Sequence, residues 1–133
     1  MFRQLFSRKK PALAGTPATR RMKTYNAESG YVYQYFYEGY RVYSAAGDSG
    51  TEFVFTISGD RKTWHSIPVL VSDEAVRGWS SSHGRELSST ERYAVAKIAL
   101  FHAFDERPSP AQMNNEVRVR RADLDGIIES LDL

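Results

Sequence analysis

The stretch Tyr31–Tyr43, YVYQYFYEGYRVY, holds six of the chain's eight tyrosines. β-Favoured side chains alternate along it, and this two-residue period predicts a long strand with a bulge or bend at Gly39. One face of such a strand carries four tyrosines, namely Tyr31, Tyr33, Tyr35 and Tyr37. A face of this size is large for exposure to water, so we expect a helix or an interface with a partner to cover it.

Two further strands are predicted along the chain. Thr51–Ile57 (TEFVFTI) places Phe and Ile on alternate positions, and Thr63–Val71 (TWHSIPVLV) is rich in β-favoured residues. Glycine, serine and aspartate predict a loop over Ser44–Gly50 and a hairpin connection over Ser58–Lys62. Pro68 has no N–H to donate, so the third strand is expected to be an edge, at least locally. The simplest topology is an antiparallel meander.

Helix signals follow the strands. Ser72 is a good N-cap for a short helix, and SSTE at Ser88–Glu91 is a capping box that opens the strongest helix of the chain. The alternation in Glu116–Arg121 (EVRVRR) indicates a fourth strand, and apolar residues at helical spacing over 124–131 predict a final helix. We therefore predict an α+β fold, in which a three- or four-stranded antiparallel meander has two to three helices packed mainly on one face.

Charge divides the chain into two parts. Residues 1–27 carry seven basic residues and no acidic one, whereas the remainder has 11 basic and 16 acidic residues. The first part is also rich in proline and small residues, so we expect a flexible basic segment over 1–27 and one domain over 28–133. This segment is interpreted as an unstructured leader, an electrostatic anchor for phosphate, nucleic acid or anionic lipid, or an organelle transit peptide over residues 1–24. The expected location is cytoplasmic, with an organelle as the alternative.

Several chemistries are excluded by composition and spacing. The chain has no cysteine, which removes disulfides and thiolate metal sites, and no apolar run of the roughly 20 residues needed to span a membrane. GDSG at Gly47–Gly50 is similar to the nucleophile motif of chymotrypsin-like serine proteases, but the chain is too short for their two barrels. All three histidines, His65, His83 and His102, also follow Ser49 and lack metal-binding spacing. His102 and Asp105 are interpreted as the polar face of a helix. We predict no catalytic residue, no metal ligand and no cofactor.

The leading hypothesis is a non-enzymatic binding or interaction module whose partner is another protein or a second copy of the chain, bound through the tyrosine face. The alternative is a nucleic-acid-associated protein, because exposed aromatic rings stack on bases and cations hold phosphates. Its candidate phosphate contacts are Arg8, Lys9, Lys10, Arg20, Arg21, Lys23, Arg118, Arg120 and Arg121. A third hypothesis is a small enzyme that uses His102 or His65 as its acid–base group.

Overall fold

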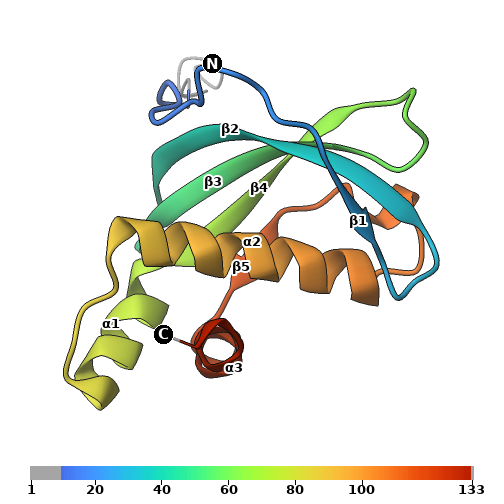
Figure 1. The fold of residues 1–133 in the computed structure, drawn as a ribbon. Coiled ribbons are helices and arrows are strands. Elements are labelled where there is room, and N and C mark those ends of the chain that lie inside the picture. The colour runs from blue at the N-terminus through green and yellow to red at the C-terminus, as the bar shows by residue number, and fades with distance from the viewer. Residues whose placement is uncertain (1–9, 133) are drawn as a thin grey trace.

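The computed structural model of the protein describes residues 10–132. Within these residues lie the strands β1 (Lys23–Asn26), β2 (Val32–Ala45), β3 (Asp48–Ser58), β4 (His65–Ser72) and β5 (Val117–Val119), and the helices α1 (Asp73–His83), α2 (Ser89–Glu106) and α3 (Arg121–Leu131), with a 3₁₀ turn at Pro110–Gln112. The strands form one curled sheet in the order β1-β2-β3-β4-β5, like half of a barrel, with the three helices packed on it (Figure 1). The predicted α+β fold is confirmed. No helix in the described range is long and apolar enough to cross a membrane.

The sheet departs from a simple meander at its last strand. β1 to β4 pair antiparallel in chain order, whereas β5 pairs parallel with β4 after the chain has passed through α1 and α2. β5 contacts only Val69–Val71, so Pro68 lies just outside this pairing, at a locally open edge as predicted. Parallel strands need a long crossover connection, which α1 and α2 provide here.

The strand predicted at Tyr31–Tyr43 is β2, and it contains a bulge at the expected glycine. Tyr37 pairs with Phe55, and the next paired residue, Gly39, lies opposite Val54, so one residue of β2 is left over. Gly39 has a φ of 133°, in the region where side chains are strained. The bulge therefore shifts the facing of the rest of β2 by one residue.

The segment Ser44–Gly50 was predicted as a loop, and the structure corrects this. Ala46 and Gly47, with φ values of 52° and 81°, make a two-residue hairpin turn, and Asp48 is already paired in β3. A turn with positive φ at both central positions matches the twist of a hairpin, so two residues are enough to connect the strands. The other small and polar residues of this segment therefore belong to the ends of β2 and β3.

β1, which the sequence does not predict, lies within the segment expected to be flexible and basic. Residues 10–22, which we call the strap, lead from above β2 into β1 (Figure 1). Ala14 exchanges two backbone hydrogen bonds of 2.8 and 2.9 Å with Tyr40. A Cβ on Gly39 would lie 2.6 Å from the Ala14 carbonyl oxygen, so the strap approaches the bulge as closely as only glycine allows.

The helix caps are those that the sequence predicts. Ser72 accepts a hydrogen bond from the Ala75 N–H at 3.1 Å. At the start of α2, the Ser88 hydroxyl accepts from the Glu91 N–H at 3.1 Å, and the Glu91 carboxylate accepts from the Ser88 N–H at 2.8 Å. Each cap satisfies backbone donors that the helix leaves free, and together they fix where α1 and α2 begin.

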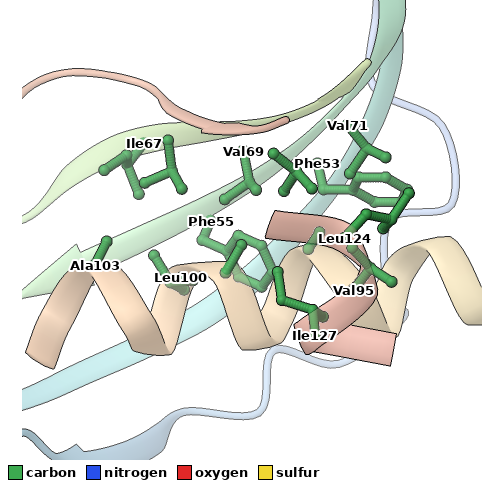
Figure 2. Close-up of a cluster of buried hydrophobic side chains, with 14 of the residues drawn as sticks. Phe53, Phe55, Ile67, Val69, Val71, Val95, Leu100, Ala103, Leu124 and Ile127 are labelled. Carbon is green, nitrogen blue, oxygen red and sulfur yellow. The ribbon is translucent and has the colours of Figure 1, made fainter. Parts of the chain in front are cut away.

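The core lies between the sheet and the helices. Figure 2 shows side chains of β3 and β4 pointing toward α2 and α3, with Phe55 and Val69 among them. Phe55, Val69, Leu100 and Leu124 are all fully buried. Burying a side chain of this size contributes about 1.5–3 kcal/mol, so this contact positions α2 across the inner side of the sheet.

Candidate functional site

The centre of the predicted tyrosine face lies under α2. Tyr33 is 0% exposed and Tyr35 5% exposed, and the ring of Tyr33 stacks on Phe104 with centroids 4.1 Å apart. Tyr35 meets Phe101 edge to face at 5.5 Å. The sequence predicts that either a helix or an interface with a partner covers the tyrosine face. For Tyr33 and Tyr35, the structure shows that a helix, α2, covers them. Both side chains belong to the hydrophobic core.

The bulge places Tyr40 beside Tyr37. Tyr40 pairs with Phe53 on β3, so its side chain lies on the inner face of the sheet together with that of Tyr37. In a strand without the bulge, Tyr37 and Tyr40 would point to opposite faces. The rings of Tyr37 and Tyr93 lie 4.7 Å apart, and the ring of Phe53 lies 6.2 Å from those of both Tyr40 and Tyr93. These four aromatic side chains form a cluster between β2, β3 and the start of α2.

The cluster forms one side of a cavity of about 590 Å³, here called the tyrosine cavity. Its lining residues are Tyr37, Tyr40, Thr51, Phe53, Ser89, Thr90, Arg92 and Tyr93. Neither Tyr40 nor Tyr93 is among the predicted site residues. A bulge is predicted at Gly39, and the one residue that it adds to β2 places Tyr40 on the same face as Tyr37.

Polar groups of the tyrosine cavity come from the first turn of α2. Ser89 and Thr90 supply hydroxyls, whereas the N–H groups of Glu91 and Arg92 are already bonded to Ser88. Within residues 10–132, the buried Nε of Arg92 has no hydrogen-bond partner. The polar part of this cavity is thus rich in donors and suits a ligand that brings acceptors.

A second cavity, of about 170 Å³, adjoins the first and shares Tyr37 and Tyr93 in its wall. We call it the lysine cavity; its other lining residues are Pro17, Thr19, Arg21, Lys23, Tyr35, Phe36 and Lys97. Burial lowers the pKa of Lys97, and the neighbouring charge of Lys23 lowers it further. In the part of the chain that the structure describes, no aspartate or glutamate lines either cavity. Within the described residues, lysine and arginine side chains therefore gather beside the tyrosine cavity without a carboxylate in either lining.

The strap builds one wall of this site. Pro17 and Thr19 line the lysine cavity. The Thr16 hydroxyl donates to the Glu38 carbonyl at 2.7 Å, and a Cβ on Gly15 would lie 2.8 Å from the Tyr40 ring. The N-terminal segment thus packs on both sides of the bulge, and part of it is a component of the site.

Most of the predicted phosphate contacts lie elsewhere. Arg8 and Lys9 fall outside the described residues, and Lys10 is exposed. Arg20 lies 3.5 Å from Glu38 and covers the Phe36 ring at 4.8 Å. Only Arg21 and Lys23, of the nine predicted cations, line the two cavities within the described chain.

The basic run Arg118–Arg121 begins within β5, at the opposite end of the sheet from β1. Arg118 pairs with Asp48 at 2.6 Å and with Glu116 at 3.0 Å, so its charge is already compensated. Arg121 donates to the Ser82 hydroxyl at 2.8 Å, and Arg120 is exposed at the start of α3. This run does not join the strap cations in a single surface.

Two of the candidate catalytic groups, Ser49 and His65, have structural partners. Ser49 of the GDSG segment donates to the Asp73 carboxylate at 2.8 Å, which ties β3 to α1. The Nε2 of His65 lies 2.7 Å from the Met113 carbonyl. His102 is exposed and lines a separate polar cavity of about 330 Å³. Across residues 10–132, no three histidine or acidic side chains are arranged to hold a metal ion.

Comparison with protein-family models, curated proteins and solved structures finds no match for this chain. Function must therefore be argued from the chemistry of the site itself. Its two parts are an aromatic cavity with hydrogen-bond donors and an adjoining cavity with lysine and arginine side chains.

Proposed function

We propose that the protein is a non-enzymatic binding module whose small-molecule ligand inserts a flat ring into the tyrosine cavity. The observation that carries this proposal is the cluster of Tyr37, Tyr40, Phe53 and Tyr93 around about 590 Å³ of free space. Ligand pockets commonly have volumes of about 300–1,000 Å³ and aromatic walls. Stacking of a ligand ring on such a wall contributes roughly 1–3 kcal/mol.

The donors at the start of α2 would orient the ring. Ser89 and Thr90 supply hydroxyls, and the guanidinium of Arg92 adds further donors. A heteroaromatic ring with nitrogen or oxygen acceptors satisfies these groups, whereas a hydrocarbon ring leaves them unpaired. This difference provides selectivity as well as affinity.

The tyrosine hydroxyls support binding rather than catalysis. Burial raises the pKa of Tyr37 and of Tyr93 above the ordinary value for tyrosine. Both side chains are therefore neutral at physiological pH, where they act as walls and hydrogen-bond partners and not as bases. The proposal moves the binding role of the tyrosine-rich strand from its buried centre, at Tyr33 and Tyr35, to its bulge.

Nuclear magnetic resonance of ¹⁵N-labelled protein tests the proposal. Titration with adenosine, indole and cyclohexanol compares a heteroaromatic ring, a largely hydrocarbon flat ring and a ring that is not flat. We expect saturable shifts of the Ser89, Thr90 and Tyr93 amides, strongest with adenosine, weaker with indole and absent with cyclohexanol. Equal response to all three, or no saturable shift at millimolar adenosine, would overturn the proposal.

A blocking variant localises the effect. Thr90→Trp introduces a large ring at an exposed position that lines the tyrosine cavity, and Ser81→Trp places the same ring at an exposed position of α1. Adenosine binding should be lost in the first variant and kept in the second. Circular dichroism checks that both remain folded, and binding that survives Thr90→Trp would contradict the assignment of the cavity.

A further inference from the structure

We infer that the ligand is a nucleoside monophosphate, with its base in the tyrosine cavity and its phosphate in the lysine cavity. This inference rests on the proposed function and adds the ligand's class and orientation. It is carried by the two residues that the cavities share, by the charge of the second cavity and, within residues 10–132, by the lack of a row of free cations leading away from them.

The junction sets the length of the ligand. Tyr37 and Tyr93 line both cavities, so a ligand long enough to occupy both lies against these two side chains. The lysine cavity has less than a third of the volume of the tyrosine cavity, which suits a compact charged group and not a second ring. A base and a phosphate joined by one sugar have this asymmetry.

The charge of the lysine cavity favours a multiply charged anion. Lys23, Lys97 and Arg21 all line it, and within residues 10–132 no carboxylate does. Two ammonium groups close enough to lower the pKa of Lys97 repel one another when the cavity is empty. A phosphate removes that repulsion and forms charge-assisted hydrogen bonds with both lysines, whereas a carboxylate brings a single charge.

The surroundings favour one nucleotide over a nucleic acid strand. A strand binder needs a row of free cations that follows the backbone from base to base. Here Arg20 is paired with Glu38, and Arg118 is paired with Asp48 and Glu116 at the far end of the sheet. Pro17 and Thr19 of the strap wall the lysine cavity on one side. Among residues 10–132, neither Arg20 nor Arg118 therefore extends the positive charge of the lysine cavity into a row of free cations.

Isothermal titration calorimetry at 150 mM salt tests the inference, with adenosine and uridine, their 5′-monophosphates, and inorganic phosphate as the probes. We expect at least one monophosphate to bind about tenfold or more tightly than its nucleoside, because hydrogen bonds to charged groups are the strong ones. Lys97→Met and Lys23→Met keep the aliphatic stem and remove the charge. Each should erase most of this advantage, measured as the ratio of monophosphate affinity to nucleoside affinity in the same variant.

Lys62→Met is the matched control, because Lys62 is exposed and lies in neither cavity. It should keep the full monophosphate advantage, and thermal unfolding of all three variants confirms that they are folded.

Equal affinity for nucleosides and monophosphates would overturn this inference and leave the proposed function intact. Failure of every nucleoside and nucleotide to bind would overturn both. Much tighter binding of an eight-residue oligothymidylate, weakening steeply with salt, would also overturn it, in favour of a strand binder.

Discussion

The hydroxyl of Tyr25 donates a 2.8 Å hydrogen bond to Asp105, and so joins β1 to the last turn of α2. The same carboxylate accepts the Glu28 N–H at 2.9 Å, and the Tyr25 ring stacks on Phe101 with centroids 4.3 Å apart. An acid at a helix C-terminus is unfavourable for the helix alone. Asp105 is explained by its contacts with the N-terminal segment, which it holds against the core.

Removing the Tyr25 hydroxyl should weaken this connection without disturbing the ring. Tyr25→Phe keeps the stacking on Phe101 and removes a hydrogen bond to a charged group, for which the expected loss of unfolding free energy is about 1.5–3 kcal/mol. Urea denaturation followed by circular dichroism measures it. Tyr31→Phe is the control, because Tyr31 is 41% exposed, and it should change stability by less than about 0.5 kcal/mol. Equal effects of the two variants would contradict the role given to Asp105.

Alkaline pH should destabilise the protein. Burial and then the hydrogen bond to Asp105 raise the pKa of Tyr25 to about 12, while an unfolded tyrosine has a pKa of about 10. The folded state therefore holds this proton more tightly. Its contribution to stability is complete below pH ~10 and is lost as the pH rises toward about 12. Burial raises the pKa of Tyr35 and Tyr37 in the same direction.

The measurement is the urea midpoint between pH 8 and pH 12 for the wild type and for Tyr25→Phe. The wild type should lose stability more steeply over this range than the variant. Lys97 acts in the opposite direction, because its lowered pKa makes the folded state bind its proton less tightly. The prediction is therefore the difference between the two curves, and parallel curves would contradict it.

Gly39→Ala should detach the strap. A Cβ at this position would lie 2.6 Å from the Ala14 carbonyl and 2.9 Å from the Thr16 hydroxyl, at a φ of 133°. We expect a loss of about 1–3 kcal/mol from backbone strain, together with faster hydrogen exchange at the Ala14 amide. Gly30→Ala is the control, since Gly30 also has a positive φ but nothing within 4 Å of the added atom. It should lose stability and keep slow exchange at Ala14.

The features that could be predicted from the sequence are those made by near neighbours. Ser88 and Glu91 are three residues apart, and their cap follows from local chemistry. The bond between Tyr25 and Asp105 joins residues 80 apart, and nothing in either neighbourhood indicates the other. The strap and β1 were hidden for this reason: their composition is that of a flexible chain, and only contacts with β2 and α2 hold them in place.

The candidate site shows the same division. Gly39 was predicted as a bulge, but the residue of β2 left over there depends on the pairing with β3, which the local sequence does not state. That pairing decides which way Tyr40 faces. The alternation predicts a binding face of Tyr31, Tyr33, Tyr35 and Tyr37. Of these four, Tyr37 lines the tyrosine cavity, whereas Tyr33 and Tyr35 lie under α2.

Breaking the buried ion pair of Arg41 and Glu52 should destabilise the protein. The two side chains lie 2.9 Å apart on neighbouring strands, and only 15% of Arg41 and 6% of Glu52 are exposed. Arg41→Met would leave the Glu52 carboxylate buried without its partner, at an expected loss of about 3–5 kcal/mol. The double variant Arg41→Met/Glu52→Leu also removes the unpaired carboxylate of Glu52. It should recover most of the lost unfolding free energy, because apolar side chains of similar size replace a buried ion pair at little cost. Urea denaturation of the wild type, both single variants and the double variant measures the coupling, and additive losses would show that the two side chains act independently.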